Sequence, residues 1–148
     1  MNKPILKFEG EYRWLSNFHV APFSFDGYLY VRTVEHYYQA AKTTDKNWVD
    51  KIMASETPAK AKRLGRECPV RSDWDRIKDS IMMQGLKYKF SQNPDLKKKL
   101  IETGTSLLVE GNNWNDNYWG YDMKHGYGQN RLGQLLMIVR LWCKDGTL

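Results

Sequence analysis

The sequence predicts an α+β protein: a single compact, mainly helical domain with a small β part near its N-terminus. Its 148 residues, 41% of them hydrophobic, suit one hydrophobic core. Aromatic residues alternate around an Asp-Gly pair within residues 23–31, which is typical of a β-hairpin. From residue 34 onward, apolar residues recur at helical spacing between capping and stop signals. We therefore expect residues 1–148 to form one domain.

The β part is predicted in two pieces. Residues 5–8 are expected to form a strand, and residues 23–31 two strands joined at Asp26-Gly27, a pair that favours a two-residue turn. Between these pieces, Ser16 and Asn17 fall in a loop, where such side chains either stabilise a turn or point into a binding site.

Three helices are expected next. The first starts at residue 34 with Thr33 as its N-cap, and a second is indicated from residue 45 or 46 to about residue 54. Thr57-Pro58 supplies an N-cap and a first-turn proline, and Gly65 a stop, for a short third helix. This helix is a candidate for binding phosphate. Its basic residues are Lys60, Lys62, Arg63 and Arg66.

A longer helix is predicted after Ser72, which forms a capping-box pattern with Asp75. An apolar stripe on this helix indicates core packing more than ligand contact. The stripe consists of Trp74, Ile77, Ile81 and Tyr88.

The C-terminal part is predicted to hold a helix framed by Asn93-Pro94 and Gly104, a short buried strand at residues 107–110, and a last helix. Asn130 is the expected N-cap of the last helix. The apolar stripe of that helix consists of Leu132, Leu135, Leu136, Val139 and Trp142.

The net charge of +6 and a pI near 9.3 favour anionic partners such as nucleotides, phosphosugars or nucleic acid. The densest basic run, residues 97–99, is expected to be a solvated helix face with no catalytic role. Aromatic residues make up 14% of the chain, which leaves some to line a pocket or stack on planar ligands.

Other composition features exclude several classes of protein. Cys68 and Cys143 lack disulfide or metal spacing and are expected to be reduced thiols. The sequence shows neither a signal peptide nor an apolar segment long enough to span a membrane, so we expect a cytoplasmic protein without a membrane partner. The three histidines form no metal-ligand pattern, so neither a metal nor another cofactor is expected.

One helical face carries the first candidate site. Glu35, Gln39 and Lys42 recur at i, i+4 and i+7, which places a carboxylate, an amide and an amine together. We predict Glu35 as the main catalytic carboxylate, with Gln39 and Lys42 as substrate contacts. The alternative is structural, because a glutamate in the first turn also stabilises the helix dipole.

A second candidate segment is the loop at residues 112–122, which is rich in amides, aromatic residues and acids. Asp116 is the second candidate for a catalytic carboxylate, although Asp and Asn in such a loop more often form turns. Trp119-Gly120 suits a stacking platform that a ligand can approach closely, and Trp114 competes for that role.

Phosphate binding is expected from basic side chains, because charge-assisted hydrogen bonds to phosphate are strong. Lys42 is the first candidate for binding a phosphate group. Arg13 and Lys62 are further candidates, with simple surface solvation as the alternative for Lys62.

Several blocks together resemble the NADAR (YbiA-like) family of N-glycosidases, over residues 8–142. The blocks lie at residues 15–18, 33–37, 42, 61–66, 82–89, 100–110, 119–120 and 130–137. One departure is the loop at residues 112–117, which is unusually rich in Asn and is expected to shape the pocket.

The resemblance implies an enzyme that breaks an N-glycosidic bond through an oxocarbenium-like sugar, which requires a carboxylate near the reacting carbon. Family members cleave phosphorylated early riboflavin-pathway intermediates and release ribose 5-phosphate, and we expect this activity here. For this chain the resemblance implies a pocket around Glu35, Lys42, Trp119 and Asn130, with the Ser16-Asn17 loop nearby.

Three alternatives stay open. Other family members remove ADP-ribose from guanine in nucleic acid, so an ADP-ribosylated nucleic acid is a possible substrate. A non-catalytic module that binds ADP-ribose or another NAD metabolite would have no need for Glu35. A plain nucleic-acid-binding domain would show a longer basic stripe without acids at its centre.

Overall fold

The computed structural model describes residues 2–148, which form two compact units. Unit 1 contains residues 2–16 and 94–148, and unit 2 contains residues 17–93. Each unit combines helices with one small two-stranded sheet, so the predicted α+β class is confirmed. The expectation of a single domain stays a prediction.

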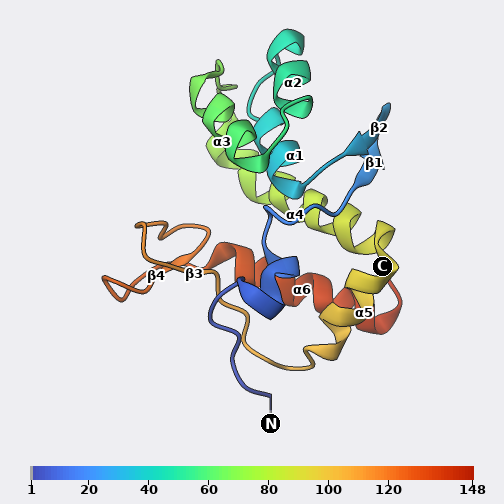
Figure 1. Cartoon of the computed structure of the whole chain (residues 1–148), viewed down its shortest axis with the longest axis vertical. Coiled ribbons are helices and arrows are strands. Elements are labelled where there is room, and N and C mark those ends of the chain that lie inside the picture. The colour runs from blue at the N-terminus through green and yellow to red at the C-terminus, as the bar shows by residue number, and fades with distance from the viewer. Residues whose placement is uncertain (1) are drawn as a thin grey trace. The chain divides into compact units, whose positions relative to one another are not determined.

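Unit 2 begins with the predicted hairpin (Figure 1). Strands β1 (Phe23–Phe25) and β2 (Tyr28–Val31) pair antiparallel, with Phe25 opposite Tyr28. Asp26 and Gly27 have φ values of 43° and 86°, as this type of two-residue turn requires. The rings of Phe25 and Tyr28 stack with centroids 5.6 Å apart, so the turn and the aromatic pair stabilise the same register.

Helices α1 (Val34–Ala40), α2 (Lys46–Met53) and α3 (Pro58–Glu67) follow. Each is started by a side-chain cap: Thr33 accepts a hydrogen bond from the His36 amide at 3.1 Å, and Thr57 accepts one from the Lys60 amide at 3.1 Å. Asp45 caps α2 in the same way. The predicted helix starts are therefore confirmed. The three helices share a core of Ala40, Ile52, Ala61, Leu64 and Cys68.

The predicted helix stop at Gly65 is wrong, because α3 continues to Glu67. Gly65 lies inside the helix and faces α1, where a Cβ atom at position 65 would overlap the side-chain amide of Gln39. The glycine therefore marks a close approach of two helices and not a C-terminal signal.

Helix α4 (Trp74–Gln92) forms as predicted, but its start and its buried face differ from the prediction. The capping box at Ser72 does not form: the N-cap is Asp73, which makes no capping bond and instead binds Arg71, with Nε and Oδ1 2.6 Å apart. The predicted stripe is only half-buried beyond Trp74. The buried residues that follow are Met82, Gly85, Leu86, Lys89 and Phe90.

The buried face of α4 is centred on Gly85, which explains the error. A Cβ atom at Gly85 would lie 3.0 Å from the ring of Tyr37 and 3.2 Å from Val34, so α4 approaches α1 most closely there. Glycine carries no hydrophobic signal, and the sequence pattern therefore indicated the neighbouring face.

Unit 1 contains the 3-10 helix η1 (Gly10–Leu15), helix α5 (Pro94–Glu102) and helix α6 (Arg131–Asp145). α5 packs against α6 (Figure 1), and both helices were predicted. Strands β3 (Gly111–Asn112) and β4 (Tyr121–Asp122) pair parallel. The buried face of α6 includes Leu132, Leu135, Leu136 and Val139, whereas Trp142 is half-buried.

The strands predicted at residues 5–8 and 107–110 are wrong as regular strands. A single parallel bridge joins Ile5 and Leu108, which are both buried, while Leu6 and Leu107 are about half exposed. The alternating burial is that of an extended chain, and backbone bonds connect the two segments from Ile5 to Leu107, from Val109 to Ile5 and from Gly111 to Leu6.

Cys68 and Cys143 are buried free thiols, as expected, and burial raises the pKa of both. Among residues 2–148, no helix is both long enough and apolar enough to cross a membrane.

Candidate active site

Glu35 is held at the start of α1 by the capped first turn and by a bond from its own amide. Thr33 caps the helix, and the amide of Glu35 donates to the carbonyl of Asn17 at 3.2 Å. Only 7% of Glu35 is exposed, which is unusual for a carboxylate in a first turn. The predicted first-turn position is therefore confirmed, and the carboxylate lies in a more buried environment than helix-dipole stabilisation requires.

Gln39 is the direct partner of Glu35. Its Nε2 donates to Glu35 Oε2 at 2.5 Å, and the residue is 3% exposed. A donor at this distance stabilises the charged form of the carboxylate. Glu35 and Gln39 thus share one face of α1, as predicted, and Gln39 is bound to the acid.

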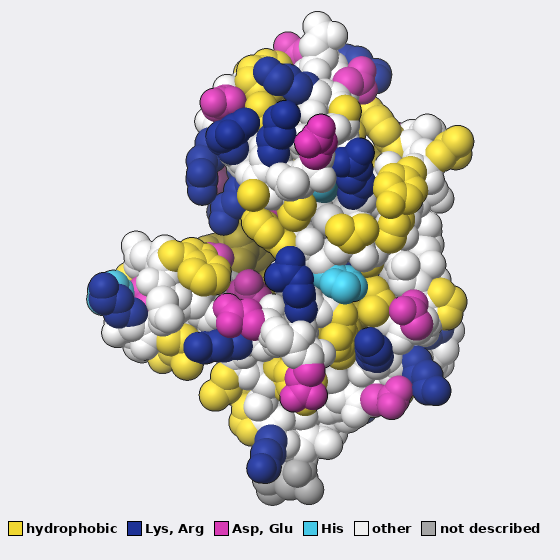
Figure 2. Space-filling model, viewed as in Figure 1, with side chains coloured by type: hydrophobic (Ala, Val, Ile, Leu, Met, Phe, Trp, Pro, Cys, Tyr) yellow, Lys and Arg dark blue, Asp and Glu magenta, His cyan; other side chains and the backbone are white. Residues whose placement is uncertain are grey.

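Lys42 was predicted on the same helical face, but α1 ends at Ala40 and Lys42 follows the C-cap residue Ala41. The predicted position of Lys42 on the helix is therefore wrong. Burial lowers the pKa of Lys42; the charge of Glu35 raises it, and the charges of Arg66 and Lys62 lower it further. These four side chains are therefore close enough to act on one another electrostatically. Lys and Arg side chains gather over the part of unit 2 where α3 lies (Figure 2).

Lys62 is half-buried, and its Nζ lies 5.9 Å from the centroid of the Phe18 ring. This contact and the influence of Lys62 on Lys42 distinguish it from a fully solvated surface lysine. Arg66 is exposed on the same helix. The short basic helix predicted from the sequence therefore carries two cations whose charges act on Lys42.

Ser16 and Asn17 fall in different units. Asn17 belongs to unit 2, is buried, and donates from Nδ2 to the sulfur of Met82 at 3.3 Å, while its Oδ1 has no hydrogen-bond partner among the described residues. Ser16 belongs to unit 1, where its amide donates to the carbonyl of Arg13 and ends η1. Arg13 is exposed. Asn17 is thus tied directly to Glu35 through its carbonyl.

Asp116 lies in unit 1 and stabilises its own loop. Its Oδ1 accepts from the amides of Trp119 at 3.2 Å and Gly120 at 3.4 Å. This is the turn-forming alternative expected for such a loop. A catalytic role for Asp116 stays a prediction.

Gly120 is buried against its own loop. A Cβ atom there would lie 2.5 Å from the carbonyl of Glu110 and 2.6 Å from Nδ2 of Asn112. Close packing of the loop therefore requires the glycine, whether or not a ligand approaches it. Trp119 is half-buried and packs edge-on against Tyr118, with centroids 5.0 Å apart, whereas Trp114 is 62% exposed.

Asn130 occupies the predicted N-cap position of α6, but its side chain does not cap the helix. It has a left-handed backbone, with φ 49°, and its amide turns back to accept from the Glu110 amide and donate to the Leu108 carbonyl, both at 2.9 Å. The predicted N-cap position is thus confirmed, but without a side-chain capping bond. The side chain connects the segment before the loop to the start of α6.

The NADAR domain family matches residues 6–142 of this chain. The chain belongs to the NADAR family. It is 40% identical to N-glycosidase YbiA of Escherichia coli over 88% of this chain and 81% of that protein. A riboflavin biosynthesis protein of Vibrio vulnificus is 36% identical over 95% of this chain, which spans 38% of that longer protein. The NMR structure of Escherichia coli YbiA matches with a TM-score of 0.87 and 37% identity, over 99% of this chain and 89% of that one.

The prediction of a NADAR-family enzyme is confirmed by these comparisons, and this NADAR protein is an N-glycosidase. A purely binding module and a plain nucleic-acid-binding domain are thereby set aside.

Several buried polar side chains of this NADAR protein were not predicted from the sequence, and Lys89 and Asn112 are two of them. Lys89 is completely buried on α4, with Nζ 5.2 Å from the centroid of the Phe90 ring. Asn112 is 2% exposed and hydrogen bonds to the backbone of its own loop. Lys89 resembles neighbouring Lys87 in sequence, so nothing marked it. The Asn-rich composition of residues 112–117 was the one available signal for Asn112.

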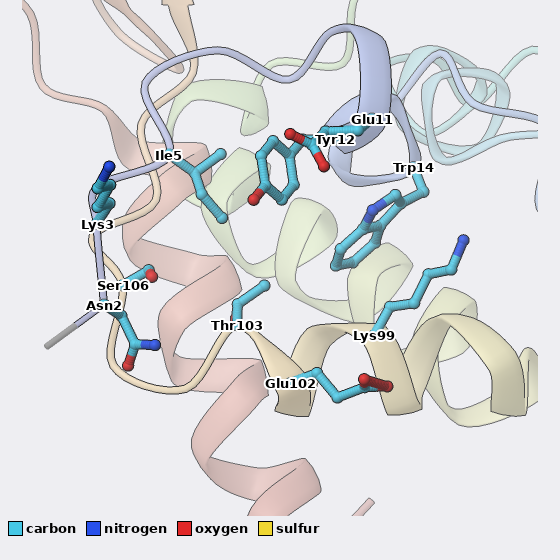
Figure 3. Close-up of a pocket in the computed structure, with 10 residues that line it drawn as sticks. All are labelled: Asn2, Lys3, Ile5, Glu11, Tyr12, Trp14, Lys99, Glu102, Thr103 and Ser106. Atoms are coloured by element: carbon cyan, nitrogen blue, oxygen red, sulfur yellow. The ribbon is translucent and has the colours of Figure 1, made fainter.

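Unit 1 of the NADAR protein contains a hollow of about 400 Å³ (Figure 3). It lies among Asn2, Lys3, Ile5, Glu11, Tyr12, Trp14, Lys99, Glu102, Thr103 and Ser106, and includes none of the predicted site residues. Two lysines and two glutamates balance its charge. The hydroxyl of Thr103 already donates to the Leu100 carbonyl and accepts from Arg140. We therefore assign no substrate to this hollow.

Proposed function

We propose that this NADAR protein hydrolyses the N-glycosidic bond of a small phosphorylated N-riboside, such as an early riboflavin-biosynthesis intermediate, and releases ribose 5-phosphate. The observation that carries the proposal is the buried carboxylate of Glu35, bound by Gln39, whose charge acts on Lys42 as do the cations Lys62 and Arg66 of α3. A relative that is a riboflavin biosynthesis protein supports this class of substrate.

In the proposed reaction, the bond between C1 of the ribose and the base nitrogen breaks, and the base leaves with the electron pair. Water then adds to C1 of the oxocarbenium-like sugar, and its proton completes the departing base. The Glu35 carboxylate stabilises the positive charge at C1 or orients the attacking water. The hydrogen bond from Gln39 favours the charged form of Glu35 that this role requires.

The cations supply the proposed phosphate site. Lys42, Lys62 and Arg66 lie close enough for the last two to lower the pKa of the first. A phosphate placed among them would relieve this repulsion and accept charge-assisted hydrogen bonds. A neutral riboside has no such group to offer, so the arrangement favours a phosphorylated substrate.

The loop of unit 1 has a supporting role in the proposal. Trp119 is the proposed stacking surface for the base, because an indole provides a large flat face. Asp116, Gly120 and Asn130 hold the loop in shape through the contacts described above. Ser16 and Asn17 remain proposed substrate contacts.

The test compares two substrates side by side. The protein is incubated with a ribosylaminouracil phosphate and, separately, with an oligonucleotide carrying ADP-ribosylated guanosine, and released ribose 5-phosphate or ADP-ribose is measured. We expect cleavage of the riboside. Release of ADP-ribose with the riboside untouched would replace the proposal by the alternative nucleic-acid substrate.

The Glu35→Gln variant tests the assigned carboxylate. Turnover should fall on the order of 10²-fold or more, because an electrostatic or base function is lost while the side chain keeps its shape. Glu56→Gln is the control, since Glu56 is exposed and precedes the cap of α3. Unchanged turnover in Glu35→Gln, with a normal melting temperature, would remove Glu35 from the proposal.

We also infer that the reaction takes place in the cytoplasm. Cys68 and Cys143 support this location, because both are free thiols, as is usual in a reducing compartment.

A further inference from the structure

Gly65 on α3 contacts the side chain that holds the proposed catalytic carboxylate. Its missing Cβ leaves the space that the amide of Gln39 occupies, and the Gln39 Cδ would lie 2.7 Å from a Cβ at position 65. Gln39 in turn donates to Glu35 at 2.5 Å. A continuous chain of contacts therefore connects the backbone of α3 to the Glu35 carboxylate.

The amide of Gln39 is oriented by Glu35 and not by its own hydrogen-bonding needs. Its Nε2 donates to the carboxylate, while Oε1 is buried beside Gly65 and has no partner among the described residues. Leaving a buried carbonyl oxygen without a partner is unfavourable. The reverse orientation would place two oxygens of like partial charge against each other at Glu35, so the observed orientation is the one that a charged Glu35 selects.

We propose that Gln39 and Gly65 are positioning residues for Glu35: Gly65 provides the space in which the Gln39 amide aligns the carboxylate for the reaction. The inference rests on the proposed role of Glu35, and it changes the predicted role of Gln39 from a substrate contact to a partner of the acid. It also gives Gly65 a function in turnover that acts through Gln39.

The glycine is the more informative of the two residues. In a helix interior, alanine is intrinsically more favourable than glycine, so Gly65→Ala should strengthen α3 locally. The added methyl group must at the same time displace the Gln39 amide. A displacement of about 1 Å in a supporting group can lower a rate about 10²-fold. Turnover should therefore fall much more than stability.

The experiment measures kcat and KM with the ribosylaminouracil phosphate for a set of variants. Gln39→Met keeps the volume of residue 39 and removes the donor, and we expect kcat to fall about 10- to 100-fold with KM nearly unchanged. A substrate contact would instead raise KM. Gly65→Ala should lower kcat by a similar factor.

The double variant of positions 39 and 65 shows whether Gly65→Ala lowers kcat by displacing the Gln39 amide or by simple steric crowding. In a Gln39→Ala background there is no amide to displace, and only the Cβ of residue 39 remains, 3.2 Å from the new methyl group. Gly65→Ala should then have little further effect on kcat. Gly85→Ala is the matched control, because Gly85 crowds α1 at Val34 and Tyr37 and does not contact Gln39. It should leave kcat close to that of the wild type.

Glu35→Gln distinguishes a failure of the positioning role from a failure of the proposed function. An inactive Glu35→Gln variant together with a fully active Gln39→Met variant, or equal effects of Gly65→Ala with and without Gln39, would overturn the positioning role. An active Glu35→Gln variant would overturn the proposed function instead. In that case the crystal structure of Gly65→Ala decides the inference: an unmoved Glu35 carboxylate would refute it.

Discussion

At the scale of single residues, Asn112 shows how an amide becomes part of the scaffold. Its Nδ2 donates to the carbonyls of Asp116 at 2.8 Å and Tyr121 at 3.2 Å, and its Oδ1 accepts from the amides of Trp114 and Asp116. One buried side chain thus satisfies several backbone groups of the segment that runs from β3 to β4. The loop is therefore stabilised by this side chain together with the pairing of the two short strands.

Asp116 allows a residue-scale prediction. Asn keeps the Oδ1 acceptor that binds the amides of Trp119 and Gly120, but it lacks the negative charge. If the carboxylate only stabilises the loop, Asp116→Asn should retain turnover within a few-fold, whereas Asp116→Ala should destabilise the loop by about 1 kcal/mol or more. Steady-state kinetics and thermal melting check both variants. A loss of turnover in Asp116→Asn comparable to that of Glu35→Gln would make Asp116 a catalytic residue.

At the scale of elements, the side chain of His36 anchors the first turn of α1. His36 is completely buried; the Thr33 hydroxyl lies 2.7 Å from its Nδ1, and its Nε2 lies 2.9 Å from the carbonyl of Ser55, just after α2. Since a carbonyl can only accept, Nε2 carries the proton and Nδ1 accepts from Thr33. A neutral imidazole therefore connects α1 to the end of α2.

The buried His36 predicts a loss of stability at mildly acidic pH. Burial lowers the pKa of His36 below its usual 6.5, and the nearby Arg32 lowers it further, against the effect of the Ser55 hydrogen bond. The unfolded chain then binds a proton at a higher pH than the folded protein. The contribution of His36 to the free energy of unfolding should therefore be constant above about pH 6.5 and decrease as the pH falls below that value.

Urea unfolding between pH 7.5 and pH 5 measures this dependence. His36→Gln, which has a donor and an acceptor but does not titrate, is the comparison and should show a flatter profile over the same range. Equal slopes for the two proteins would show that His36 is not the group responsible.

Helix α3 carries the second prediction at this scale. Lys62→Gln should raise the KM for a phosphorylated riboside about 10- to 100-fold, because one charged hydrogen bond contributes about 1.5–3 kcal/mol. The KM for the same riboside without phosphate should not change. Lys60→Gln is the control on the same helix, since Lys60 is exposed and is not among the charges that act on Lys42. An equal effect of both substitutions would indicate general surface charge and not a phosphate site.

At the scale of the whole molecule, segments from the two ends of the chain belong to the same unit. Unit 1 is assembled from residues 2–16 and 94–148, so its first segment precedes the whole of unit 2 in the sequence. The bridge between Ile5 and Leu108 connects these distant segments, as does the bond from the Thr105 amide to Asn2. Contacts of such high sequence separation form only when much of the chain is already in place.

A calorimetric experiment tests the predicted single domain. We expect one unfolding transition, with equal calorimetric and van't Hoff enthalpies. The reason is that unit 1 is built from residues 2–16 and 94–148, so the chain of unit 2 is inserted between its two segments. Two separable transitions would show that the two units unfold independently and would contradict the expectation of one domain.

The sequence by itself determined the features that depend on neighbours along the chain. The Asp26-Gly27 turn, the caps at Thr33 and Thr57, and the spacing of Glu35 and Gln39 are local, because each involves residues within about one helical turn. These features define the helix starts and place the proposed acid beside its amide partner.

Only the tertiary structure decided the features that depend on close approach between segments. Gly65 and Gly85 were assigned wrongly or overlooked because a glycine's role is set by what fills the space of its missing side chain. Asn130 was expected as the N-cap of α6 and occupies that position, but its side-chain amide hydrogen bonds to the backbone of residues 108 and 110. The buried position of Lys89 likewise depends on packing around α4. Distances between remote segments are not encoded in periodicity, so no spacing rule could have given them.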